Sequence, residues 1–383
     1  MFDFQRKPRS FVGFSYPLAN QRWLVTFRKF IGAVLFDKNS VLWPVTFNQI
    51  RGAVMTVQTD QQGQGALVAV VVTYNRLEHL KLTVARLLDT APQHLSAVVV
   101  VDNASTDDTA TWLATQDDLR LDVFRSETNG GGAAGFDHGM RRAVALHDPD
   151  WVVVMDDDGR PQTGAFEAFH GLDLQEWDAI AAAVYYPSGE ICDMNRPSRN
   201  PFWHGTVFFR TVLRLGGRGG FHLSADDYRA DVAQHIDITS FVGFFISRGG
   251  IEIAGYPDPD LFVYGDDGIY TLGLRKLGGR IAFEPRVKFE HDCSTFSDTD
   301  MRFRPMWKVY YYHRNLLMLY RRAAGWMFWP LLLVVVPKWL VKVRYHKGER
   351  GLFLRLLGCA IRDGLAERTG TSHAQLLRDV EGK

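Results

Sequence analysis

The sequence is poor in features that would assign it to a class at once. Only three of its 383 residues are cysteine, and Cys192, Cys293 and Cys359 are spaced neither as a disulfide framework nor as metal ligands. We therefore expect reduced thiols in a cytosolic protein. The first residues also lack the charged start and short apolar stretch of a secretory signal peptide.

Long hydrophobic runs and an excess of one charge are missing too. The longest apolar run, residues 326–336, is shorter than the ~20 residues of a spanning helix and contains Pro330, with Pro337 directly after it. Lysine and arginine number 44 against 43 aspartates and glutamates, so the net charge of +1 predicts no nucleic-acid partner. Hydrophobic residues, in contrast, make up 46% of the chain, which is enough for a substantial core.

The chain changes character twice along its length. Residues 1–64 carry aromatic side chains in short runs, which predicts a small β-rich extension ending in a polar linker. Residues 65–300 alternate strand-like and helix-like segments, and residues 301–383 have a helical pattern. The alternation predicts an α/β, Rossmann-like fold with a mostly parallel sheet flanked by helices and ligands at the strands' carboxyl ends. We expect strands at 67–73, 97–101, 119–124, 151–155, 180–187, 236–247, 280–283 and 287–289, helices at 77–88, 132–146 and 266–277, and loops around a cleft at 188–235.

Three consecutive aspartates, Asp156, Asp157 and Asp158, follow the expected strand 151–155. Three carboxylates at one strand tip repel each other, and one of them is driven to hold a proton unless a cation lies among them. Hard oxygen ligands favour Mg²⁺ or Mn²⁺ carrying the phosphates of a nucleotide. An acidic surface turn is the alternative, because aspartate and glycine also favour turns.

The spacing G-x-G-x-x-G occurs at Gly130, Gly132 and Gly135, as in dinucleotide-binding folds. These glycines follow the third expected strand, however, whereas that fingerprint belongs to the first strand. One alternative is a tight turn with close helix packing. The other is that backbone amides at this helix start approach a ribose or diphosphate.

Further acidic and histidine side chains follow other expected strands or begin a helix. Asp102 ends the second strand, where it can accept the N–H of a uracil ring or cap the following turn. Asp266 and Asp267 begin an expected helix, either as N-caps or as a base beside a metal site. His291 follows the last strand-like run and is either a structural histidine or a third metal ligand.

Residues 326–345 combine bulky aromatic side chains with flanking lysines and arginines. That mixture is typical of a segment in a membrane interface, where aromatics lie at headgroup depth and cations contact anionic lipids. A buried helix hairpin or a dimer contact is the alternative. We expect peripheral contact with the cytoplasmic face of the inner membrane, and the sequence leaves oligomerisation open.

Five motifs together resemble the family 2 glycosyltransferases, which have the GT-A fold. They lie, in order, at residues 71–76, 101–105, 129–132, 156–158 and 265–267, and the resemblance covers roughly residues 66–295. Within that family, residues 129–136 and 155–161 are most similar to bacterial galactofuranosyltransferases that build cell-wall galactan. A histidine about two dozen residues after the acidic pair is a shared trait, and it falls on His291.

The resemblance implies roles for individual residues. Asp156, Asp158 and His291 would hold Mn²⁺ or Mg²⁺, and Asp157 would face the donor sugar or ribose. Asp267 matches the family's general base, with Asp266 beside it. The donor nucleotide would be held by residues of the first three motifs, Thr73, Asn75, Arg76, Asp102, Asn129, Gly130 and Gly131.

The expected function is an inverting, metal-dependent transfer of galactofuranose from UDP-galactofuranose to a glycolipid or polysaccharide acceptor. One alternative keeps the fold and changes the donor, for instance to dTDP-rhamnose. Another is a catalytically silent scaffold of a polysaccharide assembly, although a silent protein has no need to keep like charges together.

Overall fold

The computed structural model describes residues 65–293 and 302–381. The expected β-rich extension, residues 1–64, lies outside this part of the chain. Among the described residues, the last strand ends at His291 and four α-helices follow from Lys308.

Four parallel strands in the order β3-β2-β1-β4 form the first half of one mixed sheet. They are β1 (Leu67–Thr73), β2 (Ala97–Asp102), β3 (Leu121–Arg125) and β4 (Trp151–Asp156). Their register pairs Thr73 with Asp102, and Val72 with Asp156. The polar residues that end these strands therefore meet at one edge of the sheet, as the sequence predicts.

The second half of the sheet is not a simple continuation. An antiparallel strand, β8 (Phe244–Ser247), lies between β4 and β6 (Ala179–Tyr185). The two short strands expected at 280–289 are one long strand, β9 (Ile281–His291), which runs parallel to β6 with an irregularity in the pairing. Two short antiparallel strands pair with it, β5 (Gly159–Pro161) and β7 (Gln234–Ile236).

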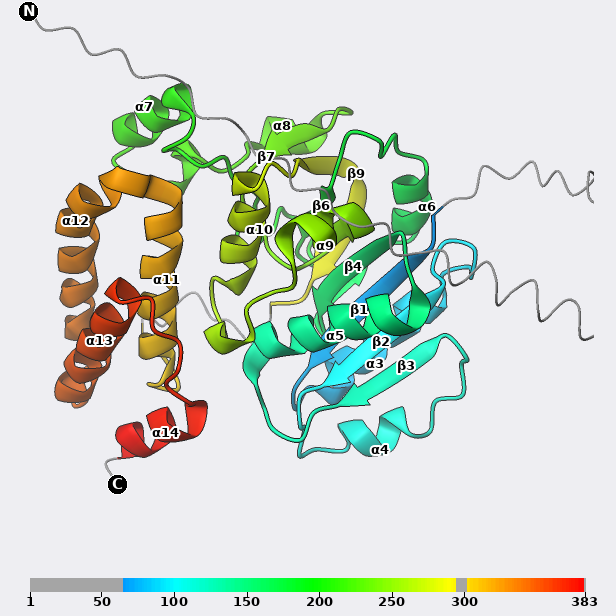
Figure 1. The fold of residues 1–383 in the computed structure, drawn as a ribbon, viewed down its shortest axis with the longest axis horizontal. Helices are drawn as coiled ribbons and strands as arrows, with labels where there is room; N and C mark the ends of the chain where they lie inside the picture. Colours follow the sequence, from blue (N-terminus) through cyan, green and yellow to red (C-terminus); the bar gives the residue numbers. More distant parts are fainter. Residues whose placement is uncertain (1–64, 294–301, 382–383) are drawn as a thin grey trace, which may run out of the picture. The chain divides into compact units, whose positions relative to one another are not determined.

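Both faces of the sheet are covered by helices, which explains why β1 is an unbroken apolar run (Figure 1). Leu67, Ala69 and Val71 pack in the core beneath α3 (Leu77–Leu88). Val68, Val70 and Val72 point the other way, into the core shared with α5 (Gly131–His147). Shorter helices complete the domain: α4 (Thr109–Leu113), α6 (Ala165–His170), α9 (Arg248–Ala254) and α10 (Asp266–Lys276).

The segment 188–235, expected to be loops, contains two short helices. These are α7 (Gly205–Leu213) and α8 (Ala225–Arg229), the latter begun by a capping box at Ser224. The N-cap of α4 is Asp108.

The C-terminal region is helical, as expected. It consists of α11 (Lys308–Ala324), α12 (Phe328–Val341), α13 (Arg350–Leu365) and α14 (His373–Glu381). Within the described residues one helical run, Lys308–Tyr345, is long and apolar enough to cross a membrane. This corrects the expectation drawn from Pro330 and Pro337, since both prolines lie inside α12 without ending it.

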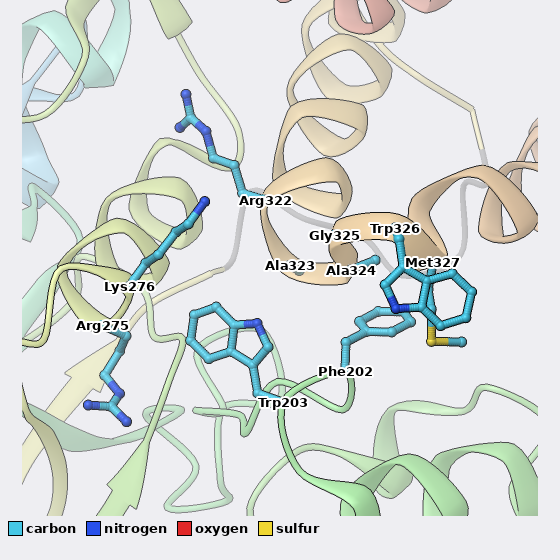
Figure 2. Close-up of a pocket in the computed structure, with 10 residues that line it drawn as sticks. All are labelled: Phe202, Trp203, Arg275, Lys276, Arg322, Ala323, Ala324, Gly325, Trp326 and Met327. Atoms are coloured by element: carbon cyan, nitrogen blue, oxygen red, sulfur yellow. The ribbon is translucent and has the colours of Figure 1, made fainter. Parts of the chain in front are cut away.

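A cavity of about 470 Å³ lies where the C-terminal helices meet the α/β part of the chain. Figure 2 shows Trp203 between a cationic side, with Lys276 and Arg322, and an aromatic side, with Phe202 and Trp326. The cavity therefore combines apolar and positively charged walls.

Candidate active site

The loop after β1 is tied to the loop after β2 at the sheet edge. Asn75 adopts a left-handed backbone with φ of 54°, and its side-chain oxygen accepts hydrogen bonds from the amides of Thr106 (2.6 Å) and Asp107 (3.3 Å). In return the Asn75 amide donates to Ser105 Oγ at 3.0 Å. The structure thus brings Asn75 beside the second motif.

Asp102 is fully buried beneath these loops. Its Oδ1 accepts the amide of Ser105 at 2.8 Å, and Oδ2 lies 3.4 Å from Arg125 Nε. The turn-capping alternative is therefore what the structure shows for Oδ1. Oδ2 is buried and has an ion-pair contact but no hydrogen bond.

The glycine-rich start of α5 is held from two sides. Asn129 Oδ1 accepts the amide of Gly131 at 2.8 Å, while Asn103 Nδ2 donates to the Gly131 carbonyl at 2.7 Å. Gly131 has a φ of 77°, and a Cβ there would lie 2.1 Å from the carbonyl oxygen of Phe262. A Cβ on Gly135 would lie 2.4 Å from Val72 Cγ1. Close packing, one of the two alternatives for this motif, is thus confirmed.

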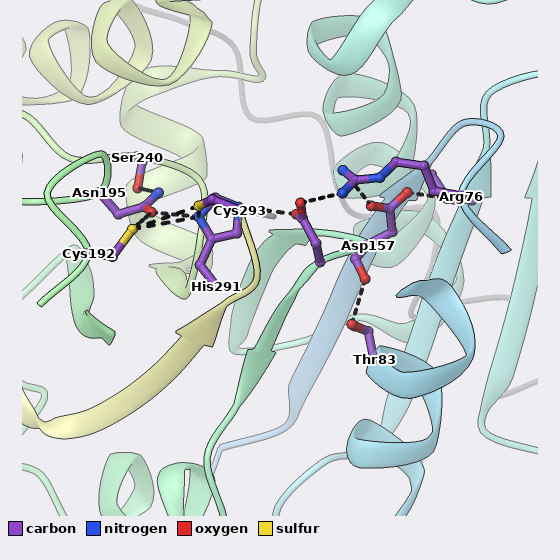
Figure 3. Close-up of polar contacts among 10 residues, drawn as sticks. Arg76, Thr83, Asp157, Cys192, Asn195, Ser240, His291 and Cys293 are labelled. Atoms are coloured by element: carbon purple, nitrogen blue, oxygen red, sulfur yellow. Dashed lines mark hydrogen bonds and ion pairs between the residues drawn. The ribbon is translucent and has the colours of Figure 1, made fainter. Parts of the chain in front are cut away.

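The aspartate triplet is already partly neutralised by an arginine of the first loop (Figure 3). Arg76 Nη2 donates to Asp158 Oδ2 at 2.7 Å, and its Nη1 lies 3.2 Å from Asp157 Oδ1. The acidic-turn alternative is wrong, because Asp157 and Asp158 are buried, with exposures of 3% and 4%. Arg76 therefore lies against the acidic cluster, where it can also meet a diphosphate.

Asp157 is placed differently from the expectation that it faces a sugar. Its Oδ2 accepts the hydroxyl of Thr73 at 2.8 Å, and its carbonyl accepts the hydroxyl of Thr83 at 2.6 Å. The side chain is thus turned into the protein between β1 and β4, where it orients Thr73 and Arg76.

The charges of the triplet are unequal. Burial raises the pKa of Asp156 to about 7, and repulsion from Asp158 adds to the shift. Burial likewise raises the pKa of Asp157 to about 7, although Arg76 opposes the shift. Burial disfavours ionisation of Asp158 as well, but its bonds to His291 and Arg76 outweigh burial and lower its pKa. Asp156 is the carboxyl group left in greatest need of a cation.

His291 ends β9 and faces the triplet because β9 pairs with β5, where Gly159 lies opposite it. Its Nε2 is 3.1 Å from Asp158 Oδ1, and its Nδ1 is 2.7 Å from Asn195 Oδ1. Burial alone would lower its pKa, but the hydrogen bond with Asp158 and further contacts raise it to about 10. The structure thus unites His291 with the triplet, from which it is far in sequence.

Asp266 and Asp267 occupy the first turn of α10, and the N-cap of that helix is Gly265. The N-capping alternative is therefore wrong for both aspartates. Burial raises the pKa of Asp267 to about 6 and that of Asp266 well above its ordinary value, with repulsion from Asp267 and Asp156 adding to the latter. The repulsion between Asp156 and Asp266 indicates that the two acidic clusters lie near each other.

Asp156, Asp266 and Asp267 each keep some accessible surface, although protein atoms enclose them on most sides. Each of these carboxyl groups is therefore partly open to solvent. Ligand atoms of Asp158 and His291 lie 3.1 Å apart, close to the ~3.0 Å between neighbouring ligands of an octahedral ion with bonds of ~2.1 Å. The buried carboxyl groups and this spacing fit a divalent metal ion.

Some residues of the site gave little signal in the sequence. Asn103 and Asn129 both bind the α5 start, and only their positions inside motifs pointed to them. Asn315, in α11, donates to the carbonyls of Leu261, Val263 and Tyr264, directly before the second acidic cluster. A buried asparagine inside an expected helix has no pattern that would reveal such a role.

Comparisons with known proteins agree with this geometry. The sequence model of "Glycosyl transferase family 2" matches residues 68–226. Galactofuranosyltransferase GlfT1 of Mycolicibacterium smegmatis is 32% identical over 232 residues, covering 59% of this chain and 71% of the relative. Undecaprenyl-phosphate mannosyltransferase of Micrococcus luteus is 31% identical over 239 residues, covering 59% and 84%.

The chain belongs to glycosyl transferase family 2. Solved structures similar to this family member include S. aureus TarS 1–349 in complex with UDP-GlcNAc, with a TM-score of 0.49, 15% identity, and coverage of 82% of this chain and 88% of that chain. Mannosyltransferase PcManGT from Pyrobaculum calidifontis, in complex with GDP-Man and Mn²⁺, has a TM-score of 0.44, 18% identity, and coverage of 94% and 86%. The sheet and helices described above are those of a GT-A-like α/β glycosyltransferase fold with a helical C-terminal region.

Proposed function

We propose that this family 2 glycosyltransferase is an inverting, metal-dependent enzyme that transfers galactofuranose from UDP-galactofuranose to a hydroxyl group of a lipid-linked or polysaccharide acceptor. The observation that carries the reaction type is the meeting of two acidic clusters, 156–158 and 266–267, beside the loops that end β1 and β2. The similarity to galactofuranosyltransferase GlfT1 supports the sugar.

The donor would bind across the edge formed by these loops. Thr73 and Asp102 define the uridine end, and the Asn75 clamp holds the two loops together. The α5 start, with Asn129, Gly130 and Gly131, would approach the ribose or diphosphate, and the amides of Gly130 and Gly131 are oriented by Asn103 and Asn129. Arg76 and Asp157 lie between these two ends.

Asp156, Asp158 and His291 would hold Mn²⁺ or Mg²⁺. Such an ion, when bound, stabilises the charge that builds up on the leaving diphosphate. Arg76 contributes a second positive charge on the same side, since its guanidinium lies 2.7 Å from Asp158. Asp156 lacks a comparable protein cation, which makes it the strongest candidate for a direct ligand.

The acceptor hydroxyl must lose its proton while it attacks the anomeric carbon from the face opposite the leaving group, and Asp267 is the proposed base. With a pKa raised to about 6, Asp267 is ionised at neutral pH and still basic enough to take that proton. Burial and repulsion from Asp267 raise the pKa of Asp266, beside it, well above its ordinary value. Because no enzyme nucleophile takes part, the product anomer is inverted.

The test of this proposal is the Asp267→Asn variant, which keeps the shape of the side chain and removes its basicity. Transfer should be abolished while UDP affinity stays within a few-fold of wild type. Asp158→Ala serves as the contrasting variant, because it should abolish Mn²⁺-dependent UDP binding in a calorimetric titration. Wild-type turnover by Asp267→Asn would exclude the assigned base.

The donor sugar is tested separately, since one relative is named a mannosyltransferase. A panel of UDP-galactofuranose, dTDP-rhamnose and GDP-mannose is incubated with enzyme and Mn²⁺, and nucleotide release is measured. Release from UDP-galactofuranose alone supports the proposal. Nucleotide release from dTDP-rhamnose or GDP-mannose instead would show that the donor is that sugar nucleotide and not UDP-galactofuranose. Release from none of the three supports a silent scaffold.

The acceptor side is proposed at the cavity of Figure 2. Arg275 and Lys276 line it from the end of α10, eight or nine residues after Asp267, roughly 12–14 Å along the helix. Arg275 is engaged with Asp237, whereas Lys276 and Arg322 supply the charges available to a phosphate. An acceptor with an anionic lipid end and a sugar end suits such a cavity and such a distance.

The same end of the molecule is proposed to lie on the cytoplasmic face of the membrane. Trp326 is 80% exposed beside the cavity, and α12 continues from it with Trp329 at 60% and Leu333 at 79%. Large apolar side chains on an exposed helix next to lysines and arginines favour an interface with anionic lipid. An internal helix hairpin would bury these side chains.

Vesicle flotation tests this contact. The full-length protein should float with vesicles that contain anionic lipid, and Trp329→Glu with Leu333→Glu should abolish flotation. Leu119→Glu is the matched control, because Leu119 is fully exposed in the loop before β3 and should leave flotation unchanged. Flotation of the double variant at the wild-type level would exclude α12 as the contact.

A further inference from the structure

Cys192 meets His291 and Cys293, about a hundred residues later in the sequence, behind the aspartate triplet (Figure 3). Cys192 lies after β6, and His291 and Cys293 lie at the end of β9. The two sulfur atoms are 4.0 Å apart, and His291 Nδ1 lies 4.0 Å from Cys192 Sγ and 3.1 Å from Cys293 Sγ. All three thiols of the chain are free, as expected, but the expectation that none has metal-ligand geometry is wrong for this pair.

The three separations are those that one zinc ion requires. With bonds of ~2.3 Å to sulfur and ~2.0 Å to nitrogen, a tetrahedral ion holds two sulfurs ~3.8 Å apart and a sulfur and a nitrogen ~3.5 Å apart. The observed distances, 4.0 Å between the sulfurs and 4.0 and 3.1 Å between nitrogen and sulfur, depart from these values by up to about half an ångström in both directions. Small side-chain movements would therefore place all three atoms on one ion.

A fourth donor faces the same point. Asn195 Oδ1 lies 2.7 Å from His291 Nδ1 and 3.0 Å from Cys192 Sγ. The Asn195 amide is held in this orientation because its Nδ2 donates to Ser240 Oγ at 2.8 Å. Cys192 is fully buried and Cys293 is half-exposed, so the cluster has a protected interior and one accessible side for entry of an ion.

We propose that Cys192 Sγ, Cys293 Sγ and His291 Nδ1 bind a zinc ion, with Asn195 Oδ1 at the fourth position. Two thiolates select a borderline-soft ion such as Zn²⁺ over the hard ions Mg²⁺ and Mn²⁺. This site is separate from the donor-site ion and goes beyond the proposed transfer reaction, because it involves the opposite nitrogen of the His291 ring.

The zinc ion fixes the orientation of His291. With Nδ1 bound to zinc, Nε2 faces Asp158 Oδ1, at the observed 3.1 Å. Carboxylate, histidine and zinc in this order are a recurrent arrangement that sets the ring plane and its basicity. In the donor-free enzyme Nε2 carries a proton and donates it to Asp158. On losing that proton, Nε2 would become free to hold the donor-site ion.

The competing interpretation is a closed hydrogen-bond network without metal. In it the Cys192 thiol donates to Asn195 Oδ1 at 3.0 Å, and His291 Nδ1 donates to the same oxygen. The two interpretations predict different metal contents and different thiol reactivities, and both quantities can be measured.

Metal content of tag-free full-length protein, measured by mass spectrometry after exhaustive dialysis, is the primary test. Wild type should hold about one zinc per chain, and Cys192→Ser and Cys293→Ser should hold close to none. Cys359→Ser is the matched control, because this half-buried cysteine lies in α13 outside the cluster, and its zinc content should equal wild type.

Cobalt substitution of wild type keeps the test independent of whether the serine variants fold. Co²⁺ added to chelator-treated wild type should give thiolate-to-metal charge-transfer absorption that saturates at one equivalent and disappears on addition of zinc. No zinc in wild type together with no such absorption overturns the proposal. Full zinc in Cys192→Ser, or only one reactive thiol in denatured wild type, which indicates a disulfide, overturns it as well.

The zinc site and the proposed transferase can fail separately. Asp267→Asn should lose transfer and keep its zinc, whereas Cys293→Ser should lose its zinc whether or not the transfer assay has found the donor sugar. A wild-type protein with zinc but no transferase activity would refute the proposed function alone.

Discussion

Asn315 holds the loop that delivers the second acidic cluster, and its removal should slow the reaction from outside the active site. Its Nδ2 lies 2.9 Å from the carbonyls of Leu261 and Val263 and 2.8 Å from that of Tyr264. Its Oδ1 accepts Arg314 Nε at 2.8 Å, and both side chains are fully buried in α11. In Asn315→Ala all of these bonds are lost, while the helix keeps a residue of high helix propensity.

The magnitude follows from the groups left behind. Two N–H donors contribute about 1 kcal/mol each, and an unpaired buried Arg314 N–H costs about 1–2 kcal/mol, so unfolding should become easier by about 3–4 kcal/mol. The carbonyl of Leu261 keeps a hydrogen bond that its neighbours lack, because it also accepts one from Arg314 Nη2 at 3.0 Å. With the loop released, Asp267 moves from its place, and a shift of about 1 Å can reduce kcat about 100-fold.

The assay combines thermal unfolding with steady-state UDP release at a temperature where the variant is folded by circular dichroism. Tyr310→Phe is the matched control, since it removes another buried bond of α11, from the Tyr310 hydroxyl to Asp363 at 2.9 Å, without touching the loop. Both variants should lose stability, but only Asn315→Ala should lose kcat, with KM for the donor nearly unchanged. Wild-type kcat in a destabilised Asn315→Ala, or an equal loss in Tyr310→Phe, would refute the role of the loop.

Two further outcomes follow from the charges and the packing. Asp156 and Asp157, whose pKa values are raised to about 7, hold protons in the folded state that the unfolded chain has released, so metal-free stability should fall as pH rises from about 4 to about 7. Mn²⁺ affinity in the presence of UDP should rise over the upper part of that range, because metal and protons compete; titration calorimetry that finds no pH dependence contradicts this. Gly135→Ala should destabilise the fold by about 1–3 kcal/mol, because its Cβ would lie 2.4 Å from Val72 Cγ1. Gly132→Ala, whose Cβ meets nothing nearer than 4.0 Å, should be neutral or stabilising in the same thermal unfolding measurement.

The first half of the sheet could be predicted because local pattern and burial coincide there. Strand β1 is apolar at every position since helices cover both faces, and its end is marked by Thr73 and the polar loop after it. The antiparallel insertion of β8 between β4 and β6 could not be predicted, because strand order depends on long-range pairing that leaves no periodic signal. The two prolines of α12 were misread as breaks in the apolar run, but Pro330 lies in the first turn, where a missing N–H costs no intrahelical bond, and Pro337 lies inside the helix without ending it.

Within the site, residues at strand tips were found and residues acting across the fold were not. Asp102, Asp156 and Asp158 end strands or follow them directly, so the α/β topology alone places them together. Cys192 is about a hundred residues from His291 and Cys293 in the sequence, so no spacing pattern predicts that it contacts them. The resemblance predicted that Asp157 contacts the donor, but a hydrogen bond from Thr73 and an ion pair with Arg76 hold its side chain inside the protein.

The packing of α5 predicts that nucleotide binding restricts the position of the proposed base, Asp267. Gly131 lies between Asn103, which belongs to the donor loops, and Phe262, whose carbonyl also accepts the amide of Ala133 at 3.1 Å. The same residue, Phe262, stacks on Tyr311 of α11, the helix whose Asn315 holds the loop before Asp266. No flexible spacer separates these contacts, so a ligand that orders the α5 start also restricts the loop that carries the acidic pair. Donor binding would thereby place Asp267 before an acceptor arrives, which is the order in which an inverting transfer needs its base and its leaving group.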